Sequence, residues 1–192
     1  MKRFWEPKLG MWQVTVLLGE YHVSRDDEVI STILGSCISA CVRDTKRNVG
    51  GINHFLLPRA PDSDSHRDDG APLRYGVAAL EGLINSVLRG GGDRKSLEVK
   101  VFGGGRVIEG GSDVGKTNIA FVKEFFATEG IPIAGADVGG TFARRLRYWP
   151  QTGRAQVLQI PMAKADQVVA EEKAAATRIL PQSQSASSVE LF

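Results

Sequence analysis

Two strand-forming runs that flank a short polar stretch constrain the fold of this chain more than any other feature. Ile38 to Arg43 and Val49 to Pro58 are rich in apolar and β-branched residues, and each predicts a β-strand. Asp44 to Asn48 lies between them and has the polar composition of a turn. The segment therefore predicts an antiparallel β-hairpin.

The register of this hairpin is expected to bring two reactive side chains together. A turn centred between Thr45 and Lys46 pairs Cys37 with His54. Directly opposed residues share a face of the hairpin, with Cβ atoms about 5 Å apart. A β-bulge would break this register. The prediction is a thiol that faces an imidazole.

A thiol beside an imidazole is the pattern of an activated nucleophile. The thiolate is the attacking form of cysteine, and His54 can accept the proton of Cys37. Gly35 and Ser36 precede the cysteine, and their backbone N–H groups are candidates for stabilising an oxyanion. The alternative is that Cys37 is a small core residue and His54 a strand histidine, which spacing alone does not exclude.

Several segments of the chain resemble the CheD family, the chemoreceptor glutamine deamidases of bacterial chemotaxis. The most specific are Thr32 to Cys37 and Gly50 to Pro58, which resemble the family's signature around its cysteine and histidine. Further matches extend the resemblance from Val14 to Ile160, and they are Leu18 to Tyr21, Lys100 to Gly105, Val114 and Gly115 with Asn118, and Ala136 to Gly140 with Arg144 and Arg145.

The resemblance implies a Cys–His–Thr catalytic set. Cys37 and His54 match the family's cysteine and histidine. Counting back from the cysteine puts the family's threonine at Ser31, whereas the threonine itself stands at Thr32, so both hydroxyls are candidates. The implied reaction is hydrolysis of glutamine side-chain amides to glutamate, with no cofactor and no metal.

The same resemblance implies partners and a rival function. The substrate would be the cytoplasmic helices of chemoreceptors, and the phosphatase CheC would be a regulatory partner. A non-catalytic adaptor that binds receptors or CheC is the alternative, although an adaptor has no need of both Cys37 and His54. Arg144, Arg145 and Arg147 are expected at the surface, where they could meet an acidic receptor helix.

Residue periodicity elsewhere predicts helices among further strands. Apolar residues at three- and four-residue steps predict a helix over Pro72 to Arg89. Leu97 to Phe102 alternates like a strand, and Arg144 to Trp149 with Ala155 to Ile160 predicts a second hairpin. This mixture predicts an α/β fold with mixed sheets. The resemblance implies that the sheets are layered in an α-β-β-α sandwich.

Length and composition suit one globular domain. The 192 residues are 42% hydrophobic with a net charge of +2, which gives no strong case for binding nucleic acid or a membrane surface. No apolar run approaches the roughly 20 residues of a membrane-spanning helix. Residues 1–12 are predicted as a flexible extension, 13–162 as the deamidase-like domain, and 163–192 as a helical and disordered tail.

The cysteine count indicates a cytoplasmic protein and argues against a metal site. Two cysteines do not make a disulfide framework, and a reducing cytoplasm is where a thiolate enzyme is expected. Cys41 shares a strand face with Cys37 and could join His22 or His54 at a metal. Zinc sites usually need a second close pair of ligands, so Cys41 is predicted as a core residue.

A remote alternative is a nucleotide-binding loop. Gly110 to Thr117 fits the phosphate-cradling pattern G-x-x-x-x-G-K-[ST]. That loop should follow directly on a strand, yet Gly103 to Glu109 intervenes after the strand that ends at Phe102. Pro132 and Gly135 also disfavour a buried parallel strand after the helix. The pattern is therefore a weaker candidate than the cysteine–histidine pair.

Overall fold

The computed structural model describes residues 1–57, 71–107 and 114–160, together with residues 170 and 174. The tail predicted over 163–192 lies outside the described residues apart from 170 and 174. In chain order the elements are β1 (Lys2–Glu6), β2 (Met11–Thr15), β3 (Tyr21–Ser24), β4 (Glu28–Leu34), β5 (Ile38–Asp44), β6 (Val49–Asn53), α1 (Ala71–Arg89), a 3-10 helix (Arg94–Ser96), β7 (Leu97–Gly103), α2 (Val114–Thr128), β8 (Ile133–Val138), β9 (Ala143–Trp149) and β10 (Arg154–Ile160).

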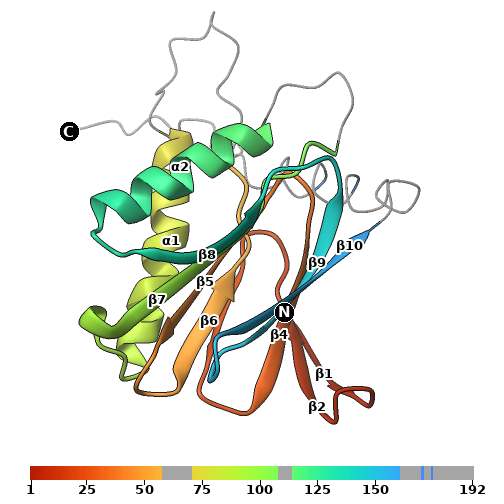
Figure 1. Cartoon of the computed structure of the whole chain (residues 1–192), viewed down its shortest axis with the longest axis vertical. Coiled ribbons are helices and arrows are strands. Elements are labelled where there is room, and N and C mark those ends of the chain that lie inside the picture. The colour runs from red at the N-terminus through yellow and green to blue at the C-terminus, as the bar shows by residue number, and fades with distance from the viewer. Residues whose placement is uncertain (58–70, 108–113, 161–169, 171–173, 175–192) are drawn as a thin grey trace, which may run out of the picture.

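The strands form two five-stranded mixed sheets (Figure 1). The first sheet has the order β1-β2-β4-β9-β10, and the second sheet has the order β3-β6-β5-β7-β8. β2 pairs in parallel with β4, and β7 pairs in parallel with β8. The remaining pairs are antiparallel, including the predicted hairpins of β5 with β6 and of β9 with β10. The α/β class with mixed sheets in one domain is confirmed.

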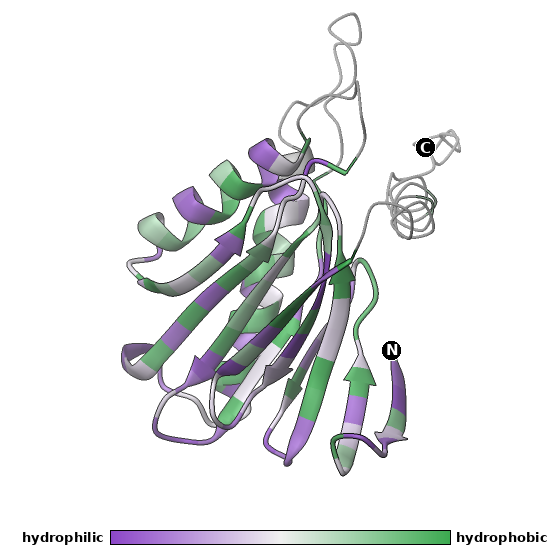
Figure 2. Ribbon diagram, turned by 45° about the vertical axis from the view of Figure 1, so that its right-hand side comes forward, coloured by the Kyte–Doolittle hydropathy of each residue, from purple (hydrophilic) through white to green (hydrophobic). Residues whose placement is uncertain are grey.

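Both described helices cover the outer face of the second sheet, and the first sheet packs against its other face (Figures 1 and 2). Apolar and polar residues alternate along the strands in Figure 2, as the two-residue period of a strand requires. On β5, Ile38, Ala40 and Val42 face the helices, whereas Cys41, like Cys37 just before the strand, faces the first sheet. The described residues thus contain one helical layer and two sheet layers of the implied α-β-β-α sandwich. Within the described ranges, no helix is long and apolar enough to span a membrane.

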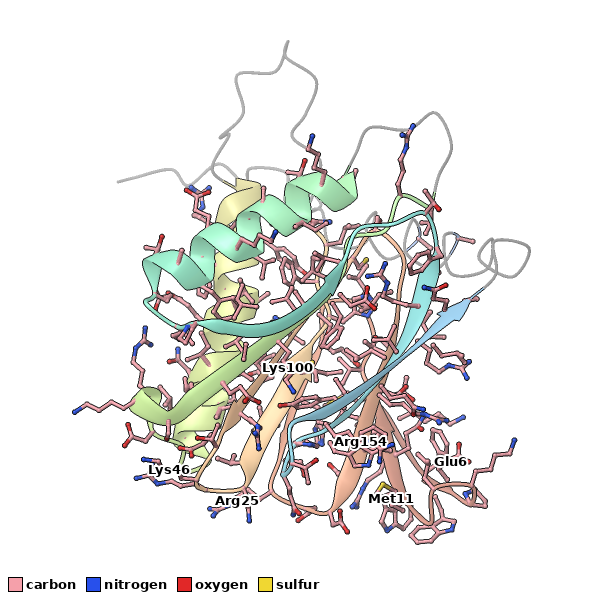
Figure 3. All side chains as sticks on the ribbon, in the orientation of Figure 1. Glu6, Met11, Arg25, Lys46, Lys100 and Arg154 are labelled. Atoms are coloured by element: carbon pink, nitrogen blue, oxygen red, sulfur yellow. The ribbon has the colours of Figure 1, made fainter. Side chains whose placement is uncertain are left out.

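The space between the two sheets holds an apolar cluster, with polar contacts beside it. Lys100 on β7, labelled in Figure 3, donates from Nζ to the Gly153 carbonyl in the β9–β10 turn at 2.7 Å. Arg43 on β5 donates to Glu98 at 2.8 Å and to the Gln151 carbonyl at 3.3 Å. The bonds to the Gly153 and Gln151 carbonyls join the second sheet to the first. The buried cluster consists of Val16, Ile30, Leu34, Cys37, Cys41, Ile52, Phe102, Leu146 and Tyr148.

The amino-terminal residues differ from the flexible extension predicted over 1–12. They contain β1 and the first two residues of β2, which pair as an antiparallel hairpin at the edge of the first sheet. Trp5 and Trp12 pack edge to face with ring centroids 5.8 Å apart, and the Arg3 guanidinium lies over the Trp12 ring. Arg3 also donates to Glu28 on β4 at 3.2 Å. These aromatic and charged contacts explain why the segment is a strand.

The register of the β5–β6 hairpin differs by two residues from the prediction. Arg43 pairs with Gly50 rather than with Asn48, and the ladder ends where Asp44 pairs with Val49. Asn48 has a left-handed φ of 48°, so it belongs to the turn and not to the strand. Because the shift is an even number of residues, every side chain keeps its predicted face.

Candidate active site

The turn at 35–37 carries Cys37 from the end of β4 in the first sheet to the start of β5 in the second. The Gly35 carbonyl accepts from the Gly105 N–H, and the Cys37 carbonyl accepts from the Gly104 N–H, both at 2.7 Å. Gly103 has φ +112°, and a Cβ there would lie 2.1 Å from the Cys37 carbonyl oxygen. Only glycine fits at that position, so the glycine run after β7 lets the backbone hold the cysteine turn closely.

Asn118 on α2 forms hydrogen bonds with both chain segments that carry the candidate residues Cys37 and His54. Its Nδ2 donates to the Ser36 carbonyl at 2.9 Å, and its Oδ1 accepts from the Leu57 N–H at 3.0 Å. The side chain is fully buried. One amide therefore links the turn before Cys37 to the strand extension that follows His54, which makes the spacing of the two segments depend on α2.

His54 lies just beyond β6 and is held by backbone and side-chain contacts. Its N–H donates to the Glu20 carbonyl at 3.0 Å, and its carbonyl accepts from the Gly19 N–H at 2.8 Å. The ring atom Nδ1 lies 2.8 Å from Thr32 Oγ1 on β4. The imidazole of the second sheet is thus fixed by a hydroxyl of the first sheet.

The contacts of Thr32 determine which ring nitrogen of neutral His54 carries the proton. Thr32 Oγ1 also lies 2.8 Å from the Val16 carbonyl oxygen, which can only accept a hydrogen bond. The hydroxyl has one hydrogen and gives it to that carbonyl. The hydrogen between Thr32 and His54 must therefore come from Nδ1–H, which leaves Nε2 as the basic nitrogen of neutral His54.

The observed register still places Cys37 and His54 on one face. Ile38 and Phe55 exchange two backbone hydrogen bonds, each 2.9 Å long, and so stand directly opposite each other. Cys37 and His54 precede these residues and project to the opposite face, toward the first sheet. They are diagonal neighbours and not directly opposed ones, an offset that a histidine side chain can bridge.

The structure separates the two hydroxyl candidates. Thr32 lies on β4 between Ile30 and Leu34, both of which belong to the cluster between the sheets. Ser31 is the alternate residue, so its side chain projects to the other face of the first sheet. Its carbonyl accepts from the Val16 N–H at 3.0 Å. The hydroxyl that contacts the His54 ring is therefore that of Thr32 and not that of Ser31.

Cys41 is a core residue, as predicted. It is fully buried in the cluster between the sheets, and burial raises the pKa of its thiol. His22, the other metal-ligand candidate, lies instead beside Glu28, with Nε2 2.7 Å from Oε1. Across the described ranges, no cluster of three or more histidine, cysteine, aspartate or glutamate side chains is placed to hold a metal ion.

Glu20 is a residue beside the site that sequence reasoning did not single out. Its backbone carbonyl bonds His54, while its carboxylate accepts from the Leu17 N–H at 3.0 Å. Burial alone would raise the pKa of Glu20, but hydrogen bonds from the amino terminus and Leu17, with the nearby charge of His54, lower the pKa. The residue lies in a turn between strands of different sheets, and no local pattern marks its approach to His54.

Arg144 differs from the predicted surface charge. It is fully buried at the start of β9 and donates to the Gly103 carbonyl at 3.2 Å and to Asp137 Oδ1 at 3.1 Å. It also donates to the carbonyls of Asp137 and Gly139. Burial lowers the pKa of Arg144, and the Asp137 carboxylate opposes that change. Arg144 therefore braces the glycine segment that holds the cysteine turn, while Arg145 is exposed as predicted.

The nucleotide-loop alternative is described only in part. Residues 110–113 of that pattern lie outside the described residues, and Val114 begins α2. A Cβ on Gly115 would lie 2.4 Å from the Gly104 carbonyl oxygen. The close packing of α2 against Gly104 therefore requires a glycine at position 115, and this explains the residue without a nucleotide.

These features define an α/β sandwich domain with a candidate cysteine–histidine site where the chain crosses between its sheets. The chain belongs to the CheD family. The family description "CheD chemotactic sensory transduction" matches residues 56–159. A relative from Halorhodospira halophila (strain DSM 244 / SL1) is 46% identical over 177 residues, which cover 90% of this chain and 82% of the relative.

Two further relatives also match most of this chain and carry the same name. A relative from Caulobacter vibrioides (strain NA1000 / CB15N) is 48% identical over 82% of this chain and 83% of its own length. One from Rhizobium etli (strain CIAT 652) is 43% identical over 94% of this chain and 96% of its own length. All three relatives are named "Probable chemoreceptor glutamine deamidase CheD".

Proposed function

We propose that this protein is a chemoreceptor glutamine deamidase of bacterial chemotaxis, a hydrolase that acts on side-chain amides. The observation that carries the proposal is the His54 imidazole, which Thr32 holds with Nδ1 protonated on the face that it shares with Cys37. That arrangement provides a base for a thiol. The names of relatives that are 43–48% identical supply the substrate class.

The first half of the reaction forms a thioester. Nε2 of His54 takes the proton from Cys37, and the thiolate attacks the side-chain carbonyl carbon of a glutamine. A C–S bond forms, and the carbonyl oxygen becomes an oxyanion that accepts hydrogen bonds from backbone N–H groups of the turn at 35–37. The carbonyl then re-forms, and the C–N bond breaks as His54 returns its proton to the leaving ammonia.

The second half releases glutamate. Neutral His54 accepts a proton from a water molecule, whose oxygen attacks the thioester carbonyl. The C–S bond breaks, the Cys37 thiolate leaves beside the protonated His54, and the carboxylic acid formed gives its proton to solvent to become the glutamate carboxylate. In both halves, Thr32 keeps the imidazole oriented with Nε2 toward the reacting atoms. Each amide consumes one water and yields one ammonia, so the proposed chemistry requires no cofactor.

The proposed setting is the cytoplasm, with the cytoplasmic helices of chemoreceptors as substrate and CheC as a regulatory partner. Each turnover replaces a neutral amide by a carboxylate. An added negative charge on a packed helix repels neighbouring carboxylates by a few tenths of a kcal/mol per pair. Such a change in repulsion is the physical signal that the receptor would read.

Peptide mass spectrometry on a purified receptor cytoplasmic fragment tests the proposal. Wild type is expected to convert specific glutamines to glutamate, whereas Cys37→Ala converts none. Cys41→Ala is the matched control, because it removes the second buried cysteine of the described residues, which lies on β5, and it is expected to retain conversion. Receptor binding without conversion by wild type would overturn the enzymatic proposal and favour the adaptor.

A further inference from the structure

A four-residue turn connects the two sheets beside the proposed active site. Leu17 to Glu20 lies between β2 of the first sheet and β3 of the second sheet. The Glu20 N–H donates to the Leu17 carbonyl at 3.0 Å, which closes a β-turn. Gly19 has φ +84°, the value that a type II turn requires at its third residue. The connection between the sheets is therefore a turn of defined geometry.

The two ends of this turn hold the two polar side chains that meet in the site. The Val16 carbonyl, directly before the turn, accepts the hydroxyl hydrogen of Thr32 at 2.8 Å. At the other end, the Gly19 N–H donates to the His54 carbonyl at 2.8 Å, and the Glu20 carbonyl accepts from the His54 N–H at 3.0 Å. The turn therefore fixes Thr32 relative to His54.

The Glu20 carboxylate acts on the peptide unit that holds Thr32. Its Oε2 accepts from the Leu17 N–H at 3.0 Å, and its Oε1 accepts from the Met1 ammonium at 2.6 Å. The Leu17 N–H and the Val16 carbonyl belong to one peptide unit, which is planar, so a bond that holds the N–H also orients the carbonyl. Glu20 therefore holds one side of this peptide unit, and the Thr32 hydroxyl is bonded to the other.

We propose that Glu20 is a positioning residue whose carboxylate holds the Val16–Leu17 peptide so that its carbonyl takes the hydrogen of Thr32, an assignment that rests on the proposed deamidase function. If that peptide rotates, the Thr32 hydroxyl loses its acceptor and can donate to His54 Nδ1 instead. The proton of neutral His54 then moves to Nε2, the nitrogen that must accept a proton from the nucleophile. Glu20 therefore acts on the reaction through Thr32 and His54.

Glu20→Gln and Glu20→Met are the matched test, because both keep the length of the side chain but only glutamine keeps an oxygen that can accept from the Leu17 N–H. Glu20→Met should lower kcat about tenfold or more on a purified receptor cytoplasmic fragment, with KM little changed, because a displaced base reacts slowly. Glu20→Gln should stay within about threefold of wild type, since a neutral acceptor replaces the charged one.

Glu6→Met is the control for the loss of a carboxylate that binds a turn. Glu6, labelled in Figure 3, accepts from the Lys8 N–H at 3.2 Å in the turn between β1 and β2. That turn holds neither Thr32 nor His54 by any hydrogen bond among the described residues. Glu6→Met should therefore keep the wild-type kcat.

¹⁵N NMR of the histidine ring nitrogens measures the tautomer without an activity assay. His54 is one of three histidines, and its signals are assigned by comparison with His54→Gln. Neutral His54 should carry its proton on Nδ1 in wild type and in Glu20→Gln, whereas Glu20→Met should shift a share of it to Nε2. A variant that only lost stability would leave the tautomer of its folded molecules unchanged.

The outcomes separate this inference from the proposed function. Rates are expressed per folded molecule, and Glu20→Ala replaces Glu20→Met in every comparison if methionine prevents folding. The inference is overturned, while the deamidase stands, if the variant without an acceptor keeps the wild-type kcat, if it loses activity with Nδ1 still protonated, or if Glu20→Gln or Glu6→Met loses as much. If wild type converts no glutamine, the proposed function fails, and Glu20 has no catalytic base to position.

Discussion

Thr32 and His54 belong to different sheets, yet Thr32 Oγ1 lies 2.8 Å from His54 Nδ1 in the buried space between them. The same hydroxyl gives its hydrogen to the Val16 carbonyl, so it can only accept from the imidazole. The contact therefore sets both the orientation and the tautomer of the proposed base, which makes it the first target for mutation.

Thr32→Val should lower kcat/KM by about tenfold or more while leaving the protein folded. Valine has nearly the shape of threonine, but it cannot hold the Nδ1–H of His54, and a hydrogen bond of about 1.4 kcal/mol corresponds to a factor of ten in rate. Deamidation is measured by mass spectrometry and folding by circular dichroism. Ser31→Ala is the matched control and should keep near-wild-type activity. The reverse ranking of the two variants would show that Ser31 is the third residue.

Asp44 should make the stability of the protein depend on pH in the acid range. Burial raises the pKa of its carboxyl, but hydrogen bonds from the backbone of Asp93 and Lys46 and from the side chains of Ser96 and Arg47 outweigh burial and lower the pKa. A folded pKa below the unfolded value of about 3.9 stabilises the fold above that pH. This stabilisation is lost as the pH falls toward the folded pKa.

Urea unfolding at pH 7, 5 and 3.5 checks the Asp44 prediction against Asp44→Asn. The variant should be less stable at pH 7, because the amide cannot replace every bond to the carboxylate. The difference in unfolding free energy between wild type and variant should shrink as the pH falls below about 4. A difference that stays constant across this range would contradict the assignment.

Asn118→Leu should destabilise the protein by about 2–4 kcal/mol, because it leaves the buried Ser36 carbonyl and Leu57 N–H without their partner. It should also lower deamidation, since the two segments that carry Cys37 and His54 lose their link. Asn85→Leu places the same change on the exposed face of α1, and its stability should stay within about 0.5 kcal/mol of wild type. Equal effects at the two asparagines would refute the bridging role.

Arg144→Met should cost about 2–4 kcal/mol of unfolding free energy. The buried carbonyls of Gly103 and Gly139 lose a charged donor, and bonds to charged groups contribute about 1.5–3 kcal/mol each. Arg145→Met is the neighbouring control on the exposed face, and it should change stability by less than about 0.5 kcal/mol. Thermal and chemical unfolding of both variants decide whether Arg144 is structural.

Local sequence pattern predicted the strands β5, β6, β7, β9 and β10, the helix α1 and the pair of candidate reactive residues. The prediction was wrong where position in the chain suggested disorder, because β1 is stabilised by pairing with β2 and by contacts such as that of Arg3 with Glu28. It was wrong again at Arg144, since nothing in the run Arg144, Arg145 and Arg147 distinguishes the buried arginine from the exposed one. Burial on a strand depends on which face meets the other sheet.

The sequence by itself determined the residue types of the proposed chemistry and their places on neighbouring strands, because the two-residue period of a strand is a local property. Only the tertiary structure decided that Thr32 rather than Ser31 meets His54, that the proton of neutral His54 lies on Nδ1, and that Asn118 joins the two segments. These are contacts between residues far apart in the chain. They follow from how the two sheets and α2 pack, which no short stretch of sequence encodes.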